Sequence, residues 1–347
     1  MRQHAKVLIK ILFCKAPTGQ ERPACIGNYF CCYLAFLAAA KVDVRKTPPS
    51  AVYEKYFKPW DDLVPMCGLL AEYGRSHLKV TELSQQFWCE RQVALSLEFP
   101  REETVEMASG SEIHKDLLLE LVDEVPVTLQ TAEDEVYLLM LNVRTGLDLL
   151  AAGGRARELY VFGRVGPCPV AGIIDELCAE RGTLTLLDHK TRTRPTLPPP
   201  PSFLTTEVQV MTYRKLLDDL RHGRYTFDDF KADRSLGALG DISPDFRAQL
   251  EAEGIYERVR PEELAQDVFR KFRALPDGSD YLIIRYLHQG SGVHLGDKVV
   301  LYDPDVIERK LAYALKFWNG ERQATGVNDR ERWKCNYCEY KGVQCQH

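Results

Sequence analysis

Three predicted β-strands follow one another directly, and this succession narrows the choice of fold more than any other feature of the sequence. Apolar and β-branched residues indicate strands at residues 158–165, 170–178 and 184–190, with a turn at Arg181-Gly182 between the last two. The proline cluster at 195–201 fits neither a helix nor a central strand, so it is expected to be an extended connector. Residues 207–220 then have the periodicity of a helix.

Helices and strands are also predicted on both sides of this unit. Val80, Leu83 and Phe87 are spaced like one helical face. The segment Ser109-Gly110-Ser111-Glu112 matches a capping box, which predicts that another helix begins there. After the unit, residues 281–288 and 299–302 are expected to be strands and residues 304–318 a helix. The order helix, three strands, helix, strand predicts a mixed α/β (α+β) fold.

Charge and length suggest one large domain behind a basic extension. The chain has 347 residues and a net charge of -5, so a polyanionic partner would have to meet a local patch. Residues 1–46 hold eight Lys or Arg against Glu21 and Asp43, and we assign them to an extension, with residues 47–347 as the domain. No continuous apolar run approaches the ~18 residues of a membrane span, the longest being at 29–40, and we expect no membrane association.

Carboxylates stand at the ends of two neighbouring predicted strands. Asp188 and Lys190 close an apolar strand and would project from the same face, and the preceding strand delivers Asp175 at its end. Two carboxylates placed together raise each other's pKa unless a cation lies between them. Mg²⁺ prefers such oxygen ligands, so the arrangement suits metal-assisted phosphodiester hydrolysis, with Lys190 orienting water or stabilising charge. The triplet alone would more often be a surface ion pair.

Other polar residues fit such a site but have ordinary readings too. His114 would join the two aspartates as a third metal ligand, although a lone helical histidine is more often a solvated or core residue. Gln209 and Tyr213 are four apart, share one helical face and could contact a nucleic acid, or they belong to a plain amphipathic helix. Arg192 and Arg194 could meet phosphates or lie in a solvated loop.

Eleven cysteines, an odd and scattered set, argue against a disulfide framework and favour a reducing compartment. Cys335, Cys338 and Cys345 nevertheless cluster at the C-terminal end with spacing typical of metal ligands. A fourth ligand is needed. His347 would complete a zinc site, whereas the distant Cys89 would complete a site of the kind that holds an iron–sulfur cluster.

These residues together resemble the motif series of RecB-type nucleases of the PD-(D/E)XK superfamily, and most closely the eukaryotic exonuclease V family. The resemblance runs over roughly residues 47–347, and the first 46 residues match nothing in that family. It rests on the following segments: Thr81-Glu82-Leu83, Trp88-Cys89-Glu90, Gly110-Ser111-Glu112-Ile113-His114, Arg157-Glu158, Val161-Phe162-Gly163, Gly172-Ile173-Ile174-Asp175-Glu176-Leu177, Asp188-His189-Lys190-Thr191-Arg192, Gln209-x3-Tyr213 and Lys334-Cys335.

The resemblance implies a restriction-endonuclease-like αβββαβ core with helical flanks and an exonuclease that degrades single-stranded DNA with Mg²⁺ or Mn²⁺. Carried over by position, Asp175, Asp188 and Lys190 would be catalytic, with the metal held by the two aspartates and His114. Gln209 and Tyr213 would support the site and contact DNA. A [4Fe-4S] cluster would be held by four cysteines, three of them in a binding segment at 330–347: Cys89, Cys335, Cys338 and Cys345.

The resemblance also implies work in DNA repair or mitochondrial DNA maintenance, and hence a nuclear or mitochondrial location. A single-strand DNA-binding protein is the expected protein partner, and we expect the chain to be a monomer. An alternative from another class is a non-catalytic nucleic-acid-binding protein with a zinc-type C-terminal knuckle. The intact set of Asp175, Asp188 and Lys190 favours the enzyme.

Overall fold

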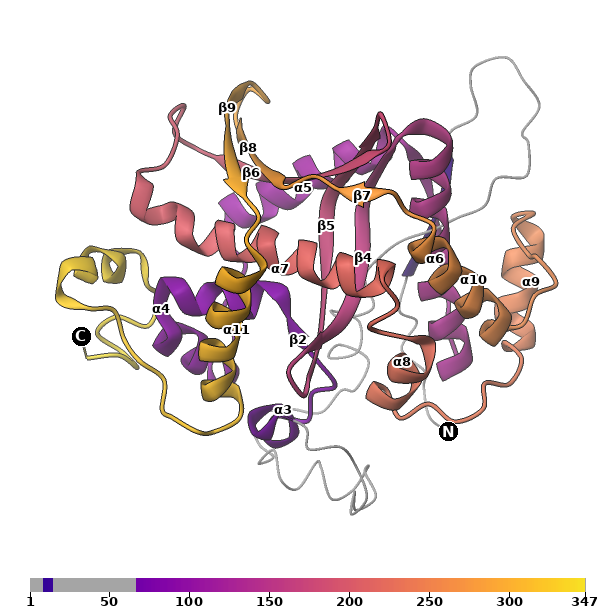
Figure 1. Ribbon diagram of the computed structural model, residues 1–347, viewed down its shortest axis with the longest axis horizontal. Helices are drawn as coiled ribbons and strands as arrows, with labels where there is room; N and C mark the ends of the chain where they lie inside the picture. Colours follow the sequence, from indigo (N-terminus) through magenta and orange to yellow (C-terminus); the bar gives the residue numbers. More distant parts are fainter. Residues whose placement is uncertain (1–8, 15–66, 347) are drawn as a thin grey trace.

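A seven-stranded mixed sheet lies at the centre of the structure, a computed structural model that describes residues 9–14 and 67–346 (Figure 1). A separate two-stranded sheet pairs β1 with β3. The strands are β1 (Ile9–Cys14), β2 (Leu78–Lys79), β3 (Val122–Val127), β4 (Arg155–Val165), β5 (Cys168–Glu180), β6 (Thr183–Arg192), β7 (Asp277–Gly278), β8 (Tyr281–His288) and β9 (His294–Leu301).

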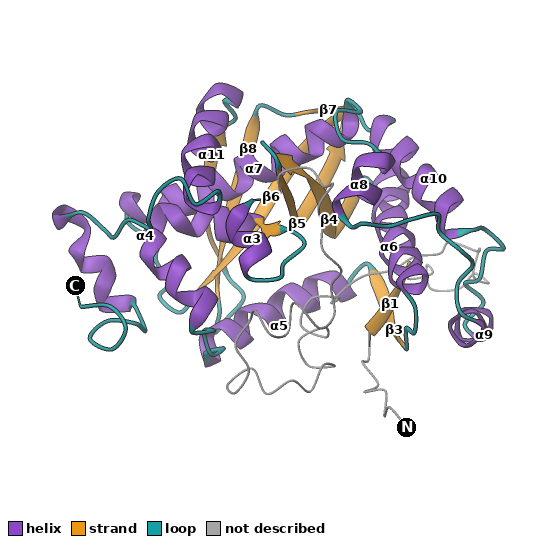
Figure 2. Ribbon diagram, turned by 90° about the horizontal axis from the view of Figure 1, so that it is seen from below, coloured by secondary structure: helices purple, strands orange, loops and turns teal. Residues whose placement is uncertain are grey.

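Helices cover both sides of the large sheet. Figures 1 and 2 show α7 on one side of β4 and β5 and α5 on the opposite side. The helices are α3 (Gly68–Glu72), α4 (Val80–Glu98), α5 (Val105–Leu119), α6 (Ala132–Gly153), α7 (Phe203–Arg221), α8 (Phe227–Asp233), α9 (Pro244–Ala252), α10 (Pro261–Arg273) and α11 (Pro304–Trp318), with short 3₁₀ helices η1 (Pro200–Ser202) and η2 (Asp329–Tyr337).

The predicted order of three strands, helix and strand is confirmed. The three predicted strands correspond to β4, β5 and β6, the following helix to α7, and the later strand to β8. Arg181 and Gly182, the predicted turn, both have positive φ angles, of 51° and 78°. The mixed α/β fold is therefore the predicted one, with α8, α9 and α10 inserted between α7 and β8.

The predicted start of the helix before the strands is wrong. Helix α5 begins at Val105, and the hydroxyl of Thr104 accepts a hydrogen bond from the Met107 backbone N–H (3.3 Å). The segment 109–112, interpreted as a capping box, therefore lies inside the helix, where the Ser111 hydroxyl donates to the Met107 carbonyl (3.1 Å). Strand β3 and helix α6, which follow α5, were not predicted either.

Part of the predicted N-terminal extension is ordered against the domain. β1 pairs antiparallel with β3, and Ile9 lies opposite Val127. The rest of residues 1–46, including the apolar run at 29–40, lies outside the described residues. Among the described residues one helix, α6, is long and apolar enough to cross a membrane, but 67% of the tested stretch is buried inside the protein. That burial is typical of the core helix of a globular fold.

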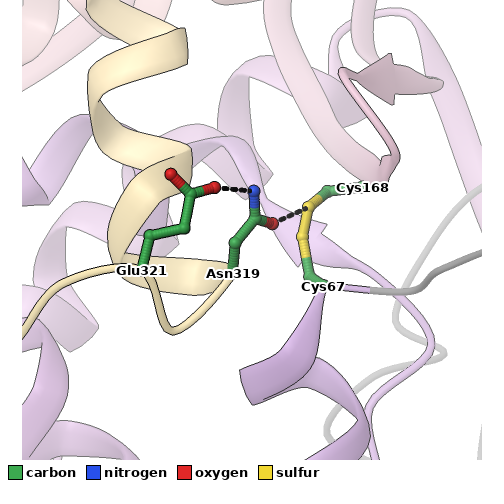
Figure 3. Close-up of a disulfide and its surroundings, with 4 residues drawn as sticks. All are labelled: Cys67, Cys168, Asn319 and Glu321. Carbon is green, nitrogen blue, oxygen red and sulfur yellow. Dashed lines mark hydrogen bonds between the residues drawn. A yellow bond between two sulfur atoms is a disulfide. The ribbon is translucent and has the colours of Figure 1, made fainter.

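One disulfide, which the sequence did not predict, joins Cys67 to Cys168 (Figure 3). Their Cα atoms are 5.4 Å apart, and both residues are almost fully buried. Asn319 lies beside the bridge at the end of α11, with its Oδ1 3.7 Å from Cys168 Sγ and its Nδ2 donating to Glu321 (2.9 Å). The bridge therefore joins the residue before α3 to the first residue of β5.

A short stretch of β5 has no strand beside it on one edge. On the other edge, β4 pairs with β5 from Cys168 to Cys178, with the Glu158–Asp175 position left out of the register. On the open edge, β2 pairs only with Val170 and Ala171, and β6 pairs only from Glu176 onward. Residues 172–175 are left between these two pairings, and Asp175 is the last of them. β5 and β6 therefore stop pairing next to Asp175 and Asp188, the two carboxylates predicted to form the site.

Gly172 allows α7 to approach this open stretch. A Cβ atom built on Gly172 would lie 2.6 Å from Cε1 of Tyr213 and 3.0 Å from Cγ2 of Val80, closer than real Cβ atoms normally come. Any side chain here must push back the tyrosine ring. Gly172 thus sets the distance between the sheet and the helix that carries Gln209 and Tyr213.

We predict that Gly172→Ala lowers the free energy of unfolding by about 1–3 kcal/mol, because overpacking a filled interior displaces its neighbours. Urea unfolding checks this. Gly237→Ala is the matched control, since a Cβ there meets nothing within 4 Å, and it should change stability by less than about 0.5 kcal/mol. Equal stabilities of the two variants would contradict the packing argument.

Candidate active site

The candidate site lies where β5 and β6 separate. Asp175 ends the open stretch of β5, and its Oδ2 accepts a hydrogen bond from the His189 backbone N–H (2.6 Å). A side chain thus takes the place of the missing strand pairing. On β6, Asp188 is 1% exposed, and its Oδ2 forms an ion pair with Lys190 Nζ at 2.8 Å. Alternation along β6 places Asp188 and Lys190 on one face, as predicted.

Burial gives the two aspartates unusual acid–base properties. Burial raises the pKa of Asp188 to about 6, and the nearby Asp175 adds to the shift while Lys190 opposes it. Burial also raises the pKa of Asp175, against the charges of Lys190 and His114. Asp188 Oδ1 is buried and has no hydrogen-bond partner among the described residues. A buried carboxylate oxygen without a partner is costly, so the donor set fits a cation.

His114 reaches the site from α5. Its Nε2 lies 3.1 Å from the His189 carbonyl oxygen, and its Nδ1 lies 3.1 Å from Glu158 Oε1 and 3.9 Å from Asp175 Oδ2. Burial alone would lower the pKa of His114, but the hydrogen bond to Glu158 and the charges of Asp175 and Glu158 outweigh it and raise the pKa to about 9. The structure therefore brings His114 beside Asp175, and the metal-ligand role that the sequence predicts for His114 stays a prediction.

Glu158 is the site residue that sequence reasoning missed. One potential ligand atom each from His114, Glu158 and Asp175 lie within 4.8 Å of one another, a spacing that could hold a metal ion. The β4–β5 register on both sides places Glu158 opposite Asp175. Its backbone is left-handed, with φ of 51°, an uncommon conformation that often marks functional positions. The sequence signal was only an acidic residue at the start of a strand.

The remaining predicted residues divide between buried and accessible positions. Gln209 and Tyr213 share a face of α7, and Gln209 Nε2 donates to the Tyr213 hydroxyl (3.4 Å). Tyr213 is 3% exposed, and its pKa is raised by burial and by the two aspartates, so it lies beside them and its ring is closed to stacking on DNA. Arg192 is partly exposed and Arg194 fully so. Neither forms an ion pair within the described part of the chain.

The four predicted cluster cysteines come together elsewhere in the protein. Each is a free thiol, and all four line one pocket with Trp88 and Lys334. Burial raises the pKa of Cys89, and the neighbouring Cys335 and Cys345 add to the shift. Helix α4 is broken at Cys89, where the backbone is extended (φ -162°, ψ 111°). The four thiols, a donor set suited to iron–sulfur clusters and zinc, are Cys89, Cys335, Cys338 and Cys345. His347, the alternative ligand, lies outside the described residues.

The chain is similar to a known protein family and to a relative within it. The profile of the family described as "Exonuclease V - a 5' deoxyribonuclease" matches residues 70–186, 179–270 and 261–346. Exonuclease V of Danio rerio is 33% identical over 313 residues, which cover 87% of this chain and 75% of that protein. The solved structure titled "Crystal structure of SSO0001" overlaps 86% of this chain and 93% of its own, with 11% identity and a TM-score of 0.40.

The class of protein is therefore a deoxyribonuclease, a hydrolase that removes nucleotides from DNA. More narrowly, the chain belongs to the exonuclease V family. This membership confirms the family inferred from the motifs.

We predict that Glu158→Gln lowers the pKa of His114 in the metal-free protein from its value of about 9, because it removes the nearest negative charge and a charge-assisted acceptor. A pH titration of the His114 ring signals by NMR checks this. Glu112→Gln, an exposed position on the same helix, makes the same charge change and should leave the pKa nearly unaltered. Equal shifts in the two variants would refute the direct role of Glu158.

Proposed function

We propose that this chain is a metal-dependent exonuclease that degrades single-stranded DNA, using Mg²⁺ or Mn²⁺. The observation that carries the proposal is the buried, partnerless Oδ1 of Asp188 beside Asp175, at an open sheet edge that His114 also reaches. Membership of the exonuclease V family supports DNA as the substrate. The preference for single strands comes from the motif resemblance.

In this proposal the ion is held by Asp175, Asp188 and His114. Glu158 contacts His114 and would offer a further oxygen ligand. When bound, the ion would supply the positive charge that activates water and offsets charge growing on the phosphate. Asp188 holds the Lys190 ammonium at 2.8 Å. From there the lysine would orient the attacking water or donate to the phosphate oxygens in the transition state.

The substrate would meet further groups around this site. Arg192 and Arg194 follow Lys190 directly and have no acidic partner in the described residues. Their guanidinium groups would contact backbone phosphates as bidentate donors. Gln209 and Tyr213 would support the aspartates rather than contact the DNA, because both side chains are buried. The contacts proposed here bind the DNA backbone and carry no base sequence preference.

We also propose that the cysteine pocket holds a [4Fe-4S] cluster. The four free thiols line one pocket, and the pKa of Cys338, like that of Cys89, is raised by burial and by the neighbouring sulfurs. Crowded thiols of this kind release their protons when they bind a metal. The cluster would join α4 to the C-terminal segment at 330–347, which makes its role structural.

The cellular setting is a further part of the proposal. We propose a role in DNA repair or mitochondrial DNA maintenance, with the protein in the nucleus or in mitochondria. A monomer acting with a single-strand DNA-binding protein is the form we expect. These statements follow the motif resemblance, and co-purification from each compartment tests them.

Asp188→Ala should abolish Mg²⁺-dependent digestion while leaving the affinity for single-stranded DNA largely intact, because it removes a metal ligand and not a DNA contact. The assay uses end-labelled linear strands and closed circular strands, with Mg²⁺ and with EDTA. The wild type should degrade linear strands with Mg²⁺ and leave circles whole. Asp297→Ala, a control on β9 whose acid pairs with Arg285 (2.8 Å), should stay active.

Two results of this assay would contradict the proposal. Full digestion by the Asp188→Ala variant would remove that residue from the mechanism. Cutting of closed circles would make the wild type an endonuclease. Strands labelled at the 5′ or the 3′ end show in the same experiment which end is attacked, and the family description leads us to expect the 5′ end.

Cys335→Ala should lose the brown colour, iron and sulfide of anaerobically purified protein, together with much of its solubility, because three thiolates do not complete a four-cysteine site. Visible absorption and iron analysis check this. Cys178→Ala is the control, since Cys178 is a free buried cysteine outside the pocket, and it should keep the colour. A colourless wild type with bound zinc would refute the iron–sulfur assignment.

A further inference from the structure

Two consecutive residues of β4, Arg157 and Glu158, contact helix α5, which carries His114. Glu158 contacts the imidazole itself, with Oε1 3.1 Å from Nδ1. Arg157 instead holds the helix further along, because its Nη1 donates to the Leu117 carbonyl and to Glu120 Oε2 (2.6 Å). Leu117 is almost one turn after His114. The position of the imidazole therefore depends on two separate attachments to the same strand.

The same guanidinium also reaches β5. Arg157 Nε donates to Glu176 Oε2 at 2.7 Å, and the two residues are directly paired in the β4–β5 register. Their side chains are 7% and 3% exposed, so the ion pair is almost fully removed from water. Glu176 follows Asp175 in the chain. Arg157 thus joins the helix of one proposed metal ligand to the strand of another.

Glu176 also lies next to the residue that links the two aspartates. His189 follows Asp188, and its Nε2 lies 3.6 Å from Glu176 Oε2. The backbone of His189 contributes to the site twice, through an N–H that donates to Asp175 and a carbonyl that faces His114. The buried pair of Arg157 and Glu176 is therefore next to His189, whose backbone contacts both Asp175 and His114.

We propose that Arg157 and Glu176 are positioning residues that set the separation of His114 and Asp175 for metal binding. This inference rests on the proposed metal-dependent function. Neither side chain is exposed enough to meet the substrate. Arginine suits the role because its planar fork offers Nε and Nη1 in fixed directions, which can bond two elements at once. Groups that orient metal ligands in this way commonly change metal affinity when they are removed.

The experiment measures equilibrium binding of Mn²⁺ to the whole protein without DNA, from the electron paramagnetic resonance signal of free Mn²⁺. We expect Arg157→Ala to weaken Mn²⁺ binding about tenfold or more, and Arg157→Lys to restore part of the affinity. Arg164→Ala is the matched control on β4, where Arg164 pairs with Asp233 (2.7 Å) and Asp229 (2.9 Å). It should lose stability with less than a twofold change in Mn²⁺ affinity.

If Arg157 only stabilised the fold, the experiment would give a different result. If Arg157→Ala and Arg164→Ala both lower the melting temperature and both keep the wild-type Mn²⁺ affinity, the positioning role is refuted. Glu176→Gln keeps the shape of the carboxylate without its charge, and it replaces Arg157→Ala if that variant does not fold. It should weaken Mn²⁺ binding in the same direction, and unchanged affinity would again refute the proposal.

Asp188→Ala separates this inference from the proposed function. If this variant binds Mn²⁺ as tightly as the wild type does, the metal site itself is misplaced and both proposals fail. If Asp188→Ala loses binding while Arg157→Ala keeps it, the metal site stands and only the positioning role of Arg157 is overturned.

Discussion

The candidate site depends on the point where β5 and β6 stop pairing. Their last pair is Glu176 with Leu187, so Asp175 and Asp188 lie just beyond it. An open edge leaves backbone groups without strand partners, and in this protein the Asp175 carboxylate accepts the N–H of His189 instead. Asp188 is 1% exposed, and its Oδ1 has no hydrogen-bond partner among the described residues. The end of the β5–β6 pairing and the partnerless carboxylate oxygen therefore occur at neighbouring residues, which is where the proposed cation would bind.

The position of helix α5 depends on a few side-chain hydrogen bonds rather than on a large apolar interface. Leu118 is the one buried residue of α5. Gln289, after β8, donates to the Glu106 carbonyl at one end of the helix (2.8 Å) and to Thr191 (2.9 Å). Arg157 holds the other end. A helix fixed at two points by polar contacts can hold a side chain such as that of His114 in a defined place without a large apolar interface.

Sequence patterns predicted the strands and the acids because both follow from local chemistry. Alternation placed Asp188 and Lys190 on one face, and apolar runs marked β5 and β6. Glu158 could not be found this way, because its place beside His114 depends on a left-handed backbone and on the register between β4 and β5. Helix α6 was missed although Thr131 and Asp134 form a reciprocal capping box at its start, while the apparent box at 109–112 lies inside α5. Local capping signals need tertiary contacts to decide between them.

The C-terminal segment is attached to α4 by contacts that do not involve the cysteine sulfurs. Glu90, next to Cys89, is 3% exposed and accepts hydrogen bonds from Arg322 (2.7 Å) and from the Thr325 backbone N–H (2.8 Å). A buried carboxylate with several donors holds its partners firmly, since leaving it unpaired would be costly. Residues beyond Thr325 have attachments of their own, because Glu339 accepts a hydrogen bond from Gln92 (2.9 Å) and the Tyr340 hydroxyl donates to the Phe99 carbonyl (2.6 Å). Contacts apart from the sulfurs therefore hold this segment beside α4 at several points, so the four thiols do not carry the attachment alone.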